Sequence, residues 1–219
     1  MDLIIFDCDG VLVDSELIAS REMARFVTDL GMPMTAETCR ARFTGLSIAT
    51  VAGQLRAEGL VLPDDFESEL RARDAAAFEA ELAPVEGVAD TLRRLVGTGR
   101  RICVASSGSP QKIRHSLDHC GLTAFFGGDL FSATEVACGK PAPDLFLHAC
   151  DRMGVAPSRA LVIEDSLAGV KGARAAGIRV FGFTGAGHCE PGHDFRLLDA
   201  GAERCYDRMA ELPSLLSIA

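Results

Sequence analysis

Two aspartates near the start of the chain, Asp7 and Asp9, are the residues best suited to do chemistry. They follow the short apolar stretch Leu3–Phe6 and precede Gly10. In an extended chain, residues i and i+2 point to the same side, roughly 6–7 Å apart. Two like charges placed together repel each other unless a cation or a shared proton compensates. The spacing therefore favours a site that holds a hard metal ion and uses carboxylates as reactants.

The Asp-x-Asp-Gly pattern also has two simpler interpretations. Asp and Gly are good turn formers, so the pattern could be only the turn after a strand. It could also be half of a calcium-binding loop, which needs a further Asp or Asn before the glycine and a glutamate after it. The apolar residues Val11–Val13 follow instead, and they are wrong for calcium.

A second polar group follows the apolar stretch Ile102–Ala105. The chain continues there as Ser106-Ser107-Gly108. A hydroxyl and open backbone N–H groups at such a position can bind an anion, helped by the start of the next helix. By itself this pattern is more typical of a turn and a helix cap.

Lys140 is one of only three lysines in the chain and lies between Gly139 and Pro141. The backbone is stiff on both sides of a proline. A lysine that only faces solvent does not require a stiff backbone, so the sequence favours a cation held in a fixed position.

Two adjacent acids, Glu164 and Asp165, end the apolar stretch Leu161–Ile163. Burying them is costly unless both are satisfied, and a helix N-cap readily explains only one of them. Carboxylates are the hard oxygen ligands that suit Mg²⁺. We therefore expect Asp165 to bind Mg²⁺ together with Asp7 and Asp9, with Glu164 in support.

These polar groups all follow short apolar strands that alternate with amphipathic helices. The expected strands are Leu3–Phe6, Ile102–Ala105, Asp129–Ser132, Leu161–Glu164 and Val180–Phe183, with a weaker one at Arg204–Tyr206. The expected helices lie near residues 88–97, 110–120, 143–153 and 166–176. This alternation predicts an α/β fold with a parallel sheet covered by helices on both faces. In such sheets ligands bind beyond the carboxyl ends of the strands.

One long interval interrupts the alternation. Residues 16–83 read as almost entirely helical and are too long for a simple crossover. We expect an inserted helical cap domain at 16–83 and a core domain formed by residues 1–15 and 84–219.

Composition narrows the classes of function. The chain has 219 residues and a formal net charge of −9, which argues against binding nucleic acid or an anionic membrane. No apolar run approaches the ~20 residues that span a bilayer, and because the first strand begins at residue 3 we expect no signal peptide. The eight cysteines form no C-x-x-C pair, so we expect buried free thiols in a reducing cytoplasm rather than a zinc site.

With these motifs in this order, the chain resembles the haloacid dehalogenase (HAD) superfamily. The resemblance covers essentially the whole chain and points to the branch that contains beta-phosphoglucomutase and 6-phosphogluconate phosphatase. The opening Phe-Asp-Cys-Asp-Gly-x-Leu-Val-Asp-Ser-Glu and the sequence Phe43-Thr44-Gly45 are similar to the latter type. The resemblance implies a Rossmann-like core with an all-helical cap, and a Mg²⁺-dependent phosphatase that forms an aspartyl-phosphate.

The resemblance also assigns roles. Asp7 would be the nucleophile, and Asp9 the general acid for the leaving alcohol and then the base for water. The main-chain carbonyl of Asp9, with Asp7 and Asp165, would bind Mg²⁺, and Glu164 would act directly or through water. Lys140 would bridge Asp7 and the phosphoryl oxygens. The phosphate-binding groups would come from Ser106, Ser107, Gly108, Lys140, Cys8, Asp9 and Gly10.

The cap is expected to select a small phosphorylated metabolite. The polar cap residues expected near the substrate are Glu16, Arg42, Thr44, Ser47 and Gln54. For Arg42 the simpler alternative is a solvent-exposed helix residue. Hexose phosphates, a phosphogluconate and phosphoglycolate all suit this machinery, and an acidic surface permits a monomer or a homodimer.

Four other functions remain as alternatives. A sugar phosphomutase of this branch carries a cap histidine and cap cations, but this chain has Ala19 and Ile48 at the relevant positions and no lysine between residues 1 and 111. Phosphonoacetaldehyde hydrolysis needs a cap lysine. Dehalogenation does not use a second acid such as Asp9. A non-catalytic binding protein on the same scaffold would be expected to have lost at least one catalytic group.

Overall fold

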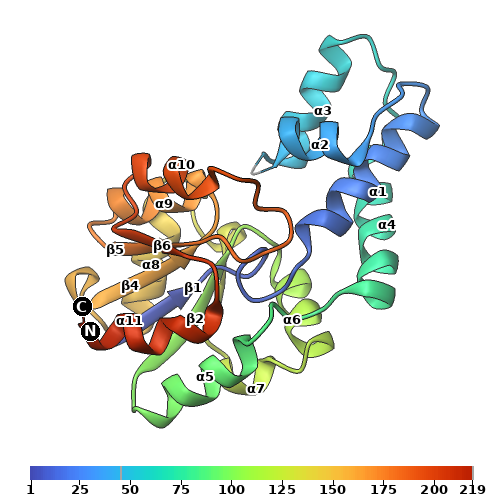
Figure 1. The fold of residues 1–219 in the computed structure, drawn as a ribbon. Coiled ribbons are helices and arrows are strands. Elements are labelled where there is room, and N and C mark those ends of the chain that lie inside the picture. The colour runs from blue at the N-terminus through green and yellow to red at the C-terminus, as the bar shows by residue number, and fades with distance from the viewer. Residues whose placement is uncertain (45, 219) are drawn as a thin grey trace. The chain divides into compact units, whose positions relative to one another are not determined.

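The computed structural model describes residues 1–44 and 46–218 and contains two compact units (Figure 1). One unit comprises Met1–Asp14 and Ala83–Ala219, and the other comprises Ser15–Leu82. These junctions each lie one residue before those expected from the sequence.

The first unit is built on a six-stranded parallel sheet in the order β3-β2-β1-β4-β5-β6. The strands are β1 Leu3–Phe6, β2 Arg101–Ser106, β3 Leu130–Ser132, β4 Ala160–Glu164, β5 Arg179–Phe183 and β6 Arg204–Tyr206. The predicted α/β fold with a parallel sheet is confirmed, and every predicted strand is present to within one residue at each end. The prediction succeeded because strands covered on both faces are continuous apolar runs.

The register of the sheet places three strand ends side by side. Ile5 of β1 pairs with Cys103 of β2 on one side and with Val162 of β4 on the other. Since all three strands are parallel, the residues that follow β1, β2 and β4 meet at one edge of the sheet. This edge carries the polar residues that the sequence singles out.

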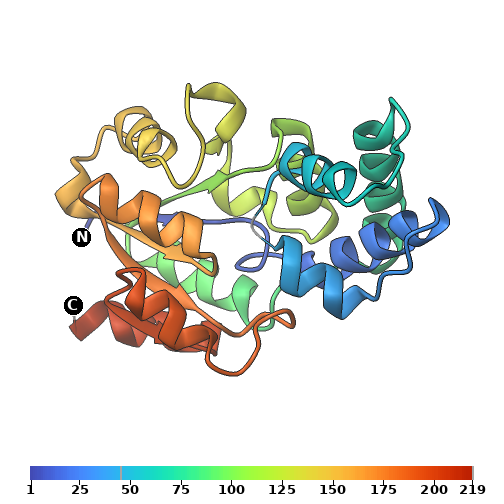
Figure 2. The same cartoon turned by 90° about the horizontal axis from the view of Figure 1, so that it is seen from above.

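Helices cover both faces of this sheet (Figures 1 and 2). One face is covered by α8 Asp144–Arg152, α9 Leu167–Ala175 and α10 His193–Asp199. The other is covered by α5 Val88–Gly97, α6 Pro110–His119, α7 Thr123–Phe126 and α11 Leu212–Ile218. Leu3 and Ile5 pack with Leu145 and Phe146 of α8 in a buried cluster, while the Phe6 ring, on the opposite side of β1, lies 6.2 Å from that of Phe126.

The second unit is helical and has a core of its own. Its helices are α1 Glu16–Asp29, α2 Ala36–Phe43, α3 Ile48–Ala57 and α4 Phe66–Glu81. The rings of Phe26 and Phe66 stack at 5.1 Å, and Arg21 makes two hydrogen bonds to Glu81 at 2.7 and 2.9 Å. None of the described helices in either unit is both long and apolar enough to cross a membrane.

The cysteines are all free thiols, in different environments. Cys8, Cys39, Cys103 and Cys150 are buried, as expected from the sequence. Cys138 is exposed, because it lies in an irregular loop rather than in an apolar strand.

Candidate active site

The candidate active site lies at the carboxyl edge of the sheet. Asp7 directly follows β1, Ser106 is the last residue of β2, and Glu164 ends β4 with Asp165 immediately after it. Lys140 reaches the same edge from the loop between β3 and α8. The four sequence motifs, far apart along the chain, therefore come together in the first unit.

Lys140 connects two of these motifs directly. Its Nζ donates to Asp7 Oδ1 and to Glu164 Oε1, at 2.6 Å in each case. The three side chains are 4%, 11% and 0% exposed, respectively, so both ion pairs are shielded from solvent. Burial alone lowers the pKa of Lys140, but the attraction of Asp7 and Glu164 outweighs burial and holds it above its usual value. The lysine is therefore a fixed cation beside Asp7.

Glu164 is held by groups on both of its oxygens. Oε1 accepts from Lys140, and Oε2 accepts from Ser166 N at 2.8 Å and from Ser166 Oγ at 2.9 Å. The side chain lies against Gly169, where an added Cβ would come within 1.7 Å of Oε1. These contacts suit Glu164 to holding Lys140 in place.

Three carboxylates lie close enough to share one metal ion. Asp7, Glu164 and Asp165 each offer an oxygen, and these oxygens all lie within 4.8 Å of one another. Burial raises the pKa of Asp7 well above its ordinary value, against the opposing effect of Lys140 and with the help of the two neighbouring acids. An all-oxygen donor set of this kind is what a hard cation such as Mg²⁺ prefers. The residues present therefore fit a divalent metal ion.

Asp9 has a partner, Lys112, that was not among the site residues predicted from the sequence. Lys112 Nζ lies 2.8 Å from Asp9 Oδ2, and the two side chains are 34% and 16% exposed. Lys112 is in the first turn of α6, the helix that begins after the Ser106 motif. Two features of the sequence could have marked Lys112 as a site residue: lysine is rare in this chain, and this lysine comes just after a candidate phosphate-binding loop.

The loop after β2 is internally bonded. Ser106 Oγ accepts from Gly108 N at 3.0 Å, and Ser132 Oγ donates to the Gly108 carbonyl at 2.6 Å. In the loop after β1, Gly10 N donates to Val13 O at 2.8 Å. Two of the backbone donors expected to bind phosphate, those of Gly108 and Gly10, thus already have partners within the protein.

Two histidines that lie outside all of the sequence motifs hold Asp165. His188 Nε2 lies 3.0 Å from Asp165 Oδ2, and His193 Nε2 lies 2.5 Å from the Asp165 carbonyl oxygen. Burial by itself lowers the pKa of His188, but the hydrogen bond to Asp165, with a contribution from Cys189, raises it to about 11. The ring thus holds a carboxylate of the candidate metal site through Nε2.

The expected substrate residues of the helical unit are described within that unit. Arg42 forms an ion pair with Glu58, and its guanidinium lies 4.6 Å from the centre of the Phe43 ring. The guanidinium of Arg42 is thus engaged by an acid of the same unit. Glu16 is half-buried in the first turn of α1, and Gln54 is exposed on α3.

Thr44 and Ser47 have local structural partners. Thr44 Oγ1 donates to the Arg40 carbonyl at 2.8 Å, and Ser47 Oγ caps α3 by accepting from Thr50 N at 3.1 Å. Gly45, the turn that placed these residues in the sequence analysis, lies outside the described residues. Contact of the cap residues with substrate stays a prediction.

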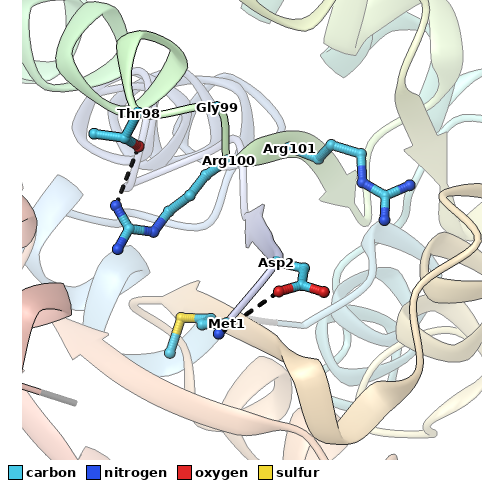
Figure 3. Close-up of a pocket in the computed structure, with 6 residues that line it drawn as sticks. All are labelled: Met1, Asp2, Thr98, Gly99, Arg100 and Arg101. Carbon is cyan, nitrogen blue, oxygen red and sulfur yellow. Dashed lines mark hydrogen bonds and ion pairs between the residues drawn. The ribbon is translucent and has the colours of Figure 1, made fainter.

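A pocket lies away from this edge (Figure 3). Its lining residues are Met1, Asp2, Thr98, Gly99, Arg100 and Arg101. Arg100 donates to Thr98 Oγ1 at 3.1 Å, and the Met1 ammonium lies 3.8 Å from Asp2. These residues lie at the amino ends of β1 and β2, whereas the candidate catalytic groups follow the carboxyl ends.

Comparison with known proteins finds relatives along the whole chain. Residues 1–177 match the family model described as haloacid dehalogenase-like hydrolase. The 6-phosphogluconate phosphatase of Escherichia coli strain K12 is 32% identical over 193 residues, which cover 87% of this chain and 86% of that protein.

Solved structures agree in fold. A conserved haloacid dehalogenase-like protein of Agrobacterium tumefaciens superposes with a TM-score of 0.89 at 39% identity, covering 100% of this chain and 98% of the other. A HAD family hydrolase of Deinococcus radiodurans R1, crystallised with bound phosphate and sodium, gives a TM-score of 0.84 at 32% identity, with 100% and 96% coverage.

Proposed function

The chain belongs to the haloacid dehalogenase-like hydrolase family and is a phosphoric monoester hydrolase, and on that premise we propose that it hydrolyses a small phosphorylated sugar or sugar acid through an aspartyl-phosphate. The substrate class is supported by the relative named 6-phosphogluconate phosphatase. The free cysteines support a reducing compartment, and we place the enzyme in the cytoplasm.

One observation carries the proposal. Lys140 Nζ lies 2.6 Å from both Asp7 Oδ1 and Glu164 Oε1 in a site shielded from solvent. A phosphate dianion repels a carboxylate that approaches it. A buried cation fixed beside that carboxylate offsets the repulsion and keeps the reacting atoms aligned, and such preorganised charges contribute several kcal/mol to catalysis.

In the first half-reaction, a carboxylate oxygen of Asp7 attacks phosphorus and the ester P–O bond breaks. Asp9 gives its proton to the leaving alkoxide, so that an alcohol departs. The phosphoryl group is now bound to Asp7 as an acyl phosphate. Splitting one difficult displacement into two easier ones is the benefit of a covalent intermediate.

In the second half-reaction, Asp9 takes a proton from water, which attacks the phosphorus of the acyl phosphate. The bond between phosphorus and the Asp7 oxygen breaks, and inorganic phosphate leaves. Asp7 returns as a carboxylate and Asp9 returns protonated. Lys140 and Ser106, with backbone N–H groups of Cys8, Asp9 and Ser107, are assigned to hold the phosphoryl oxygens. The N–H groups of Gly10 and Gly108, also expected to do so, already donate within the protein.

A divalent metal ion, which we propose to be Mg²⁺, would be held by Asp7, Asp165 and the main-chain carbonyl of Asp9. Glu164 would support the site mainly by fixing Lys140, since both of its oxygens accept hydrogen bonds. When bound, the ion neutralises charge on the transferring phosphoryl group.

Phosphate release from a panel of phosphorylated metabolites, measured with Mg²⁺ and with EDTA, tests the proposal. We expect turnover of sugar phosphates or phosphogluconate with Mg²⁺ and its loss with EDTA. Absence of phosphate release from every metabolite would reject the proposed hydrolysis. Efficient conversion of a hexose 1-phosphate into the 6-phosphate, in the presence of a bisphosphorylated activator, would favour the mutase alternative instead.

A further inference from the structure

The loop between β5 and α10 and the first residue of α10 hold both the side chain and the main chain of Asp165. His188 Nε2 contacts Asp165 Oδ2 at 3.0 Å, and His193 Nε2 contacts the Asp165 carbonyl at 2.5 Å. Neither histidine belongs to the four motifs that carry the proposed chemistry. The orientation of Asp165 nevertheless depends on them.

We propose that His188 is a positioning residue that fixes the Asp165 carboxylate for the divalent metal ion, an inference that rests on the proposed function. With Oδ2 held by the Nε2–H of His188, Oδ1 remains as the oxygen available to the ion. Groups that hydrogen-bond to a metal ligand set its orientation, and their loss typically lowers metal affinity about 10- to 100-fold.

The surroundings of His188 direct its ring toward Asp165. The two side chains are 3% and 6% exposed, so the pair is shielded from water. The only other polar contact of the ring in the described part of the chain is Cys189 Sγ, 3.6 Å from Nε2, and Nδ1 has no hydrogen-bond partner there. Burying a nitrogen without a hydrogen-bond partner is unfavourable, and an apolar side chain could fill the same space without that cost. The contact with Asp165 gives this position a reason to be histidine.

Gly10 encloses the pair from the side of the Asp7–Asp9 loop. A Cβ added at Gly10 would lie 2.0 Å from Asp165 Oδ2 and 2.8 Å from His188 Cε1. The backbone at Gly10 has φ +77° and is tied by its hydrogen bond to Val13 O at 2.8 Å. The Asp165 carboxylate therefore cannot swing toward this loop.

The segment that carries the two histidines is itself anchored. Gly187 N lies 3.3 Å from each carboxylate oxygen of Asp14, and His193 N donates to Glu190 O at 3.0 Å. At the start of this segment, a Cβ added at Gly185 would lie 2.0 Å from Asp207 O, so the backbone packs closely there. His188 is thus presented to Asp165 from a fixed backbone.

Calorimetric titration of Mg²⁺ into the metal-free protein, without substrate, tests this role. His188→Met removes the N–H donor at similar volume and is expected to raise the Kd for Mg²⁺ about 10- to 100-fold. His188→Gln keeps an N–H close to the place of Nε2 and is expected to bind Mg²⁺ as the wild type does. His148→Gln is the matched control, since His148 packs 5.5 Å from the Phe131 ring and away from Asp165.

An unchanged Kd for Mg²⁺ in folded His188→Met would overturn the inference and leave the proposed hydrolysis standing, provided that the wild type releases phosphate from the panel. If circular dichroism shows that the Met variant does not fold, His188→Asn replaces it, because the shorter amide cannot reach Oδ2. Equal Mg²⁺ affinity in the Asn and Gln variants would then overturn the inference.

Discussion

Lys112 Nζ lies 2.8 Å from Asp9 Oδ2, although the two residues are 103 positions apart in the chain. The contact brings a second cation to the candidate site, next to the residue proposed as general acid and base. Lys140 forms an ion pair with Asp7, and Lys112 forms one with Asp9. Two of the three lysines of the chain thus lie at the carboxyl edge of the sheet.

Replacing Lys112 with Met is expected to lower kcat/KM about 10- to 100-fold, because one preorganised positive charge near the developing phosphoryl charge is lost. Circular dichroism and the thermal melt should stay unchanged, since the side chain is 34% exposed. Lys171→Met is the matched control, because Lys171 is exposed on α9. Equal kcat/KM for the two variants would show that the Lys112–Asp9 contact has no catalytic role.

Replacing Asp7 with Asn is expected to reduce turnover below about 10⁻⁴ of the wild type, since an amide cannot act as the nucleophile. The fold should be retained, because Asn can still accept the hydrogen bond from Lys140. Steady-state phosphate release and a thermal melt measure the two effects. Retained phosphatase activity with an unchanged melt would reject the assignment of Asp7 as nucleophile.

Replacing Lys140 with Met is expected to destabilise the metal-free protein by about 3–5 kcal/mol, because Asp7 and Glu164 lose their buried counter-charge. Urea unfolding measures this change. Adding Glu164→Gln to the Met variant should recover part of the stability, while activity stays lost. Arg179→Met, which breaks the exposed pair with Glu203, is the control and should cost less than about 1 kcal/mol. A similar small cost for Lys140→Met would contradict the proposed role of the buried pairs.

The thiols are expected to react with Ellman's reagent in two classes at pH 8. Cys138 is exposed and should account for the fast phase. Burial raises the pKa of the Cys103 thiol well above its usual value and that of Cys150 to about 11, so at pH 8 very little reactive thiolate is present. These two should react only after unfolding in guanidinium. A fast phase that persists in Cys138→Ser would contradict this assignment.

The sequence by itself determined the sheet and the edge where its chemistry lies. Buried parallel strands such as Leu161–Ile163 are short apolar runs with polar residues directly after them, so their ends can be read locally. Because parallel strands end on the same side, the convergence of Asp7, Ser106 and Asp165 followed from strand ends alone. The position of Lys140 between a glycine and a proline marked it as the fourth motif. In the structure this lysine donates a hydrogen bond to Asp7.

Only the tertiary structure decided which groups pair at that edge. The sequence assigned Glu164 to the metal site in a supporting role, and the structure adds that its oxygens accept from Lys140 and Ser166. Lys112 and His188 carry no local signal of their partners, because a helix turn and a loop after another strand deliver them. Such contacts depend on the packing of segments distant in the chain to within a few tenths of an ångström, and a pattern of neighbouring residue types does not encode that distance.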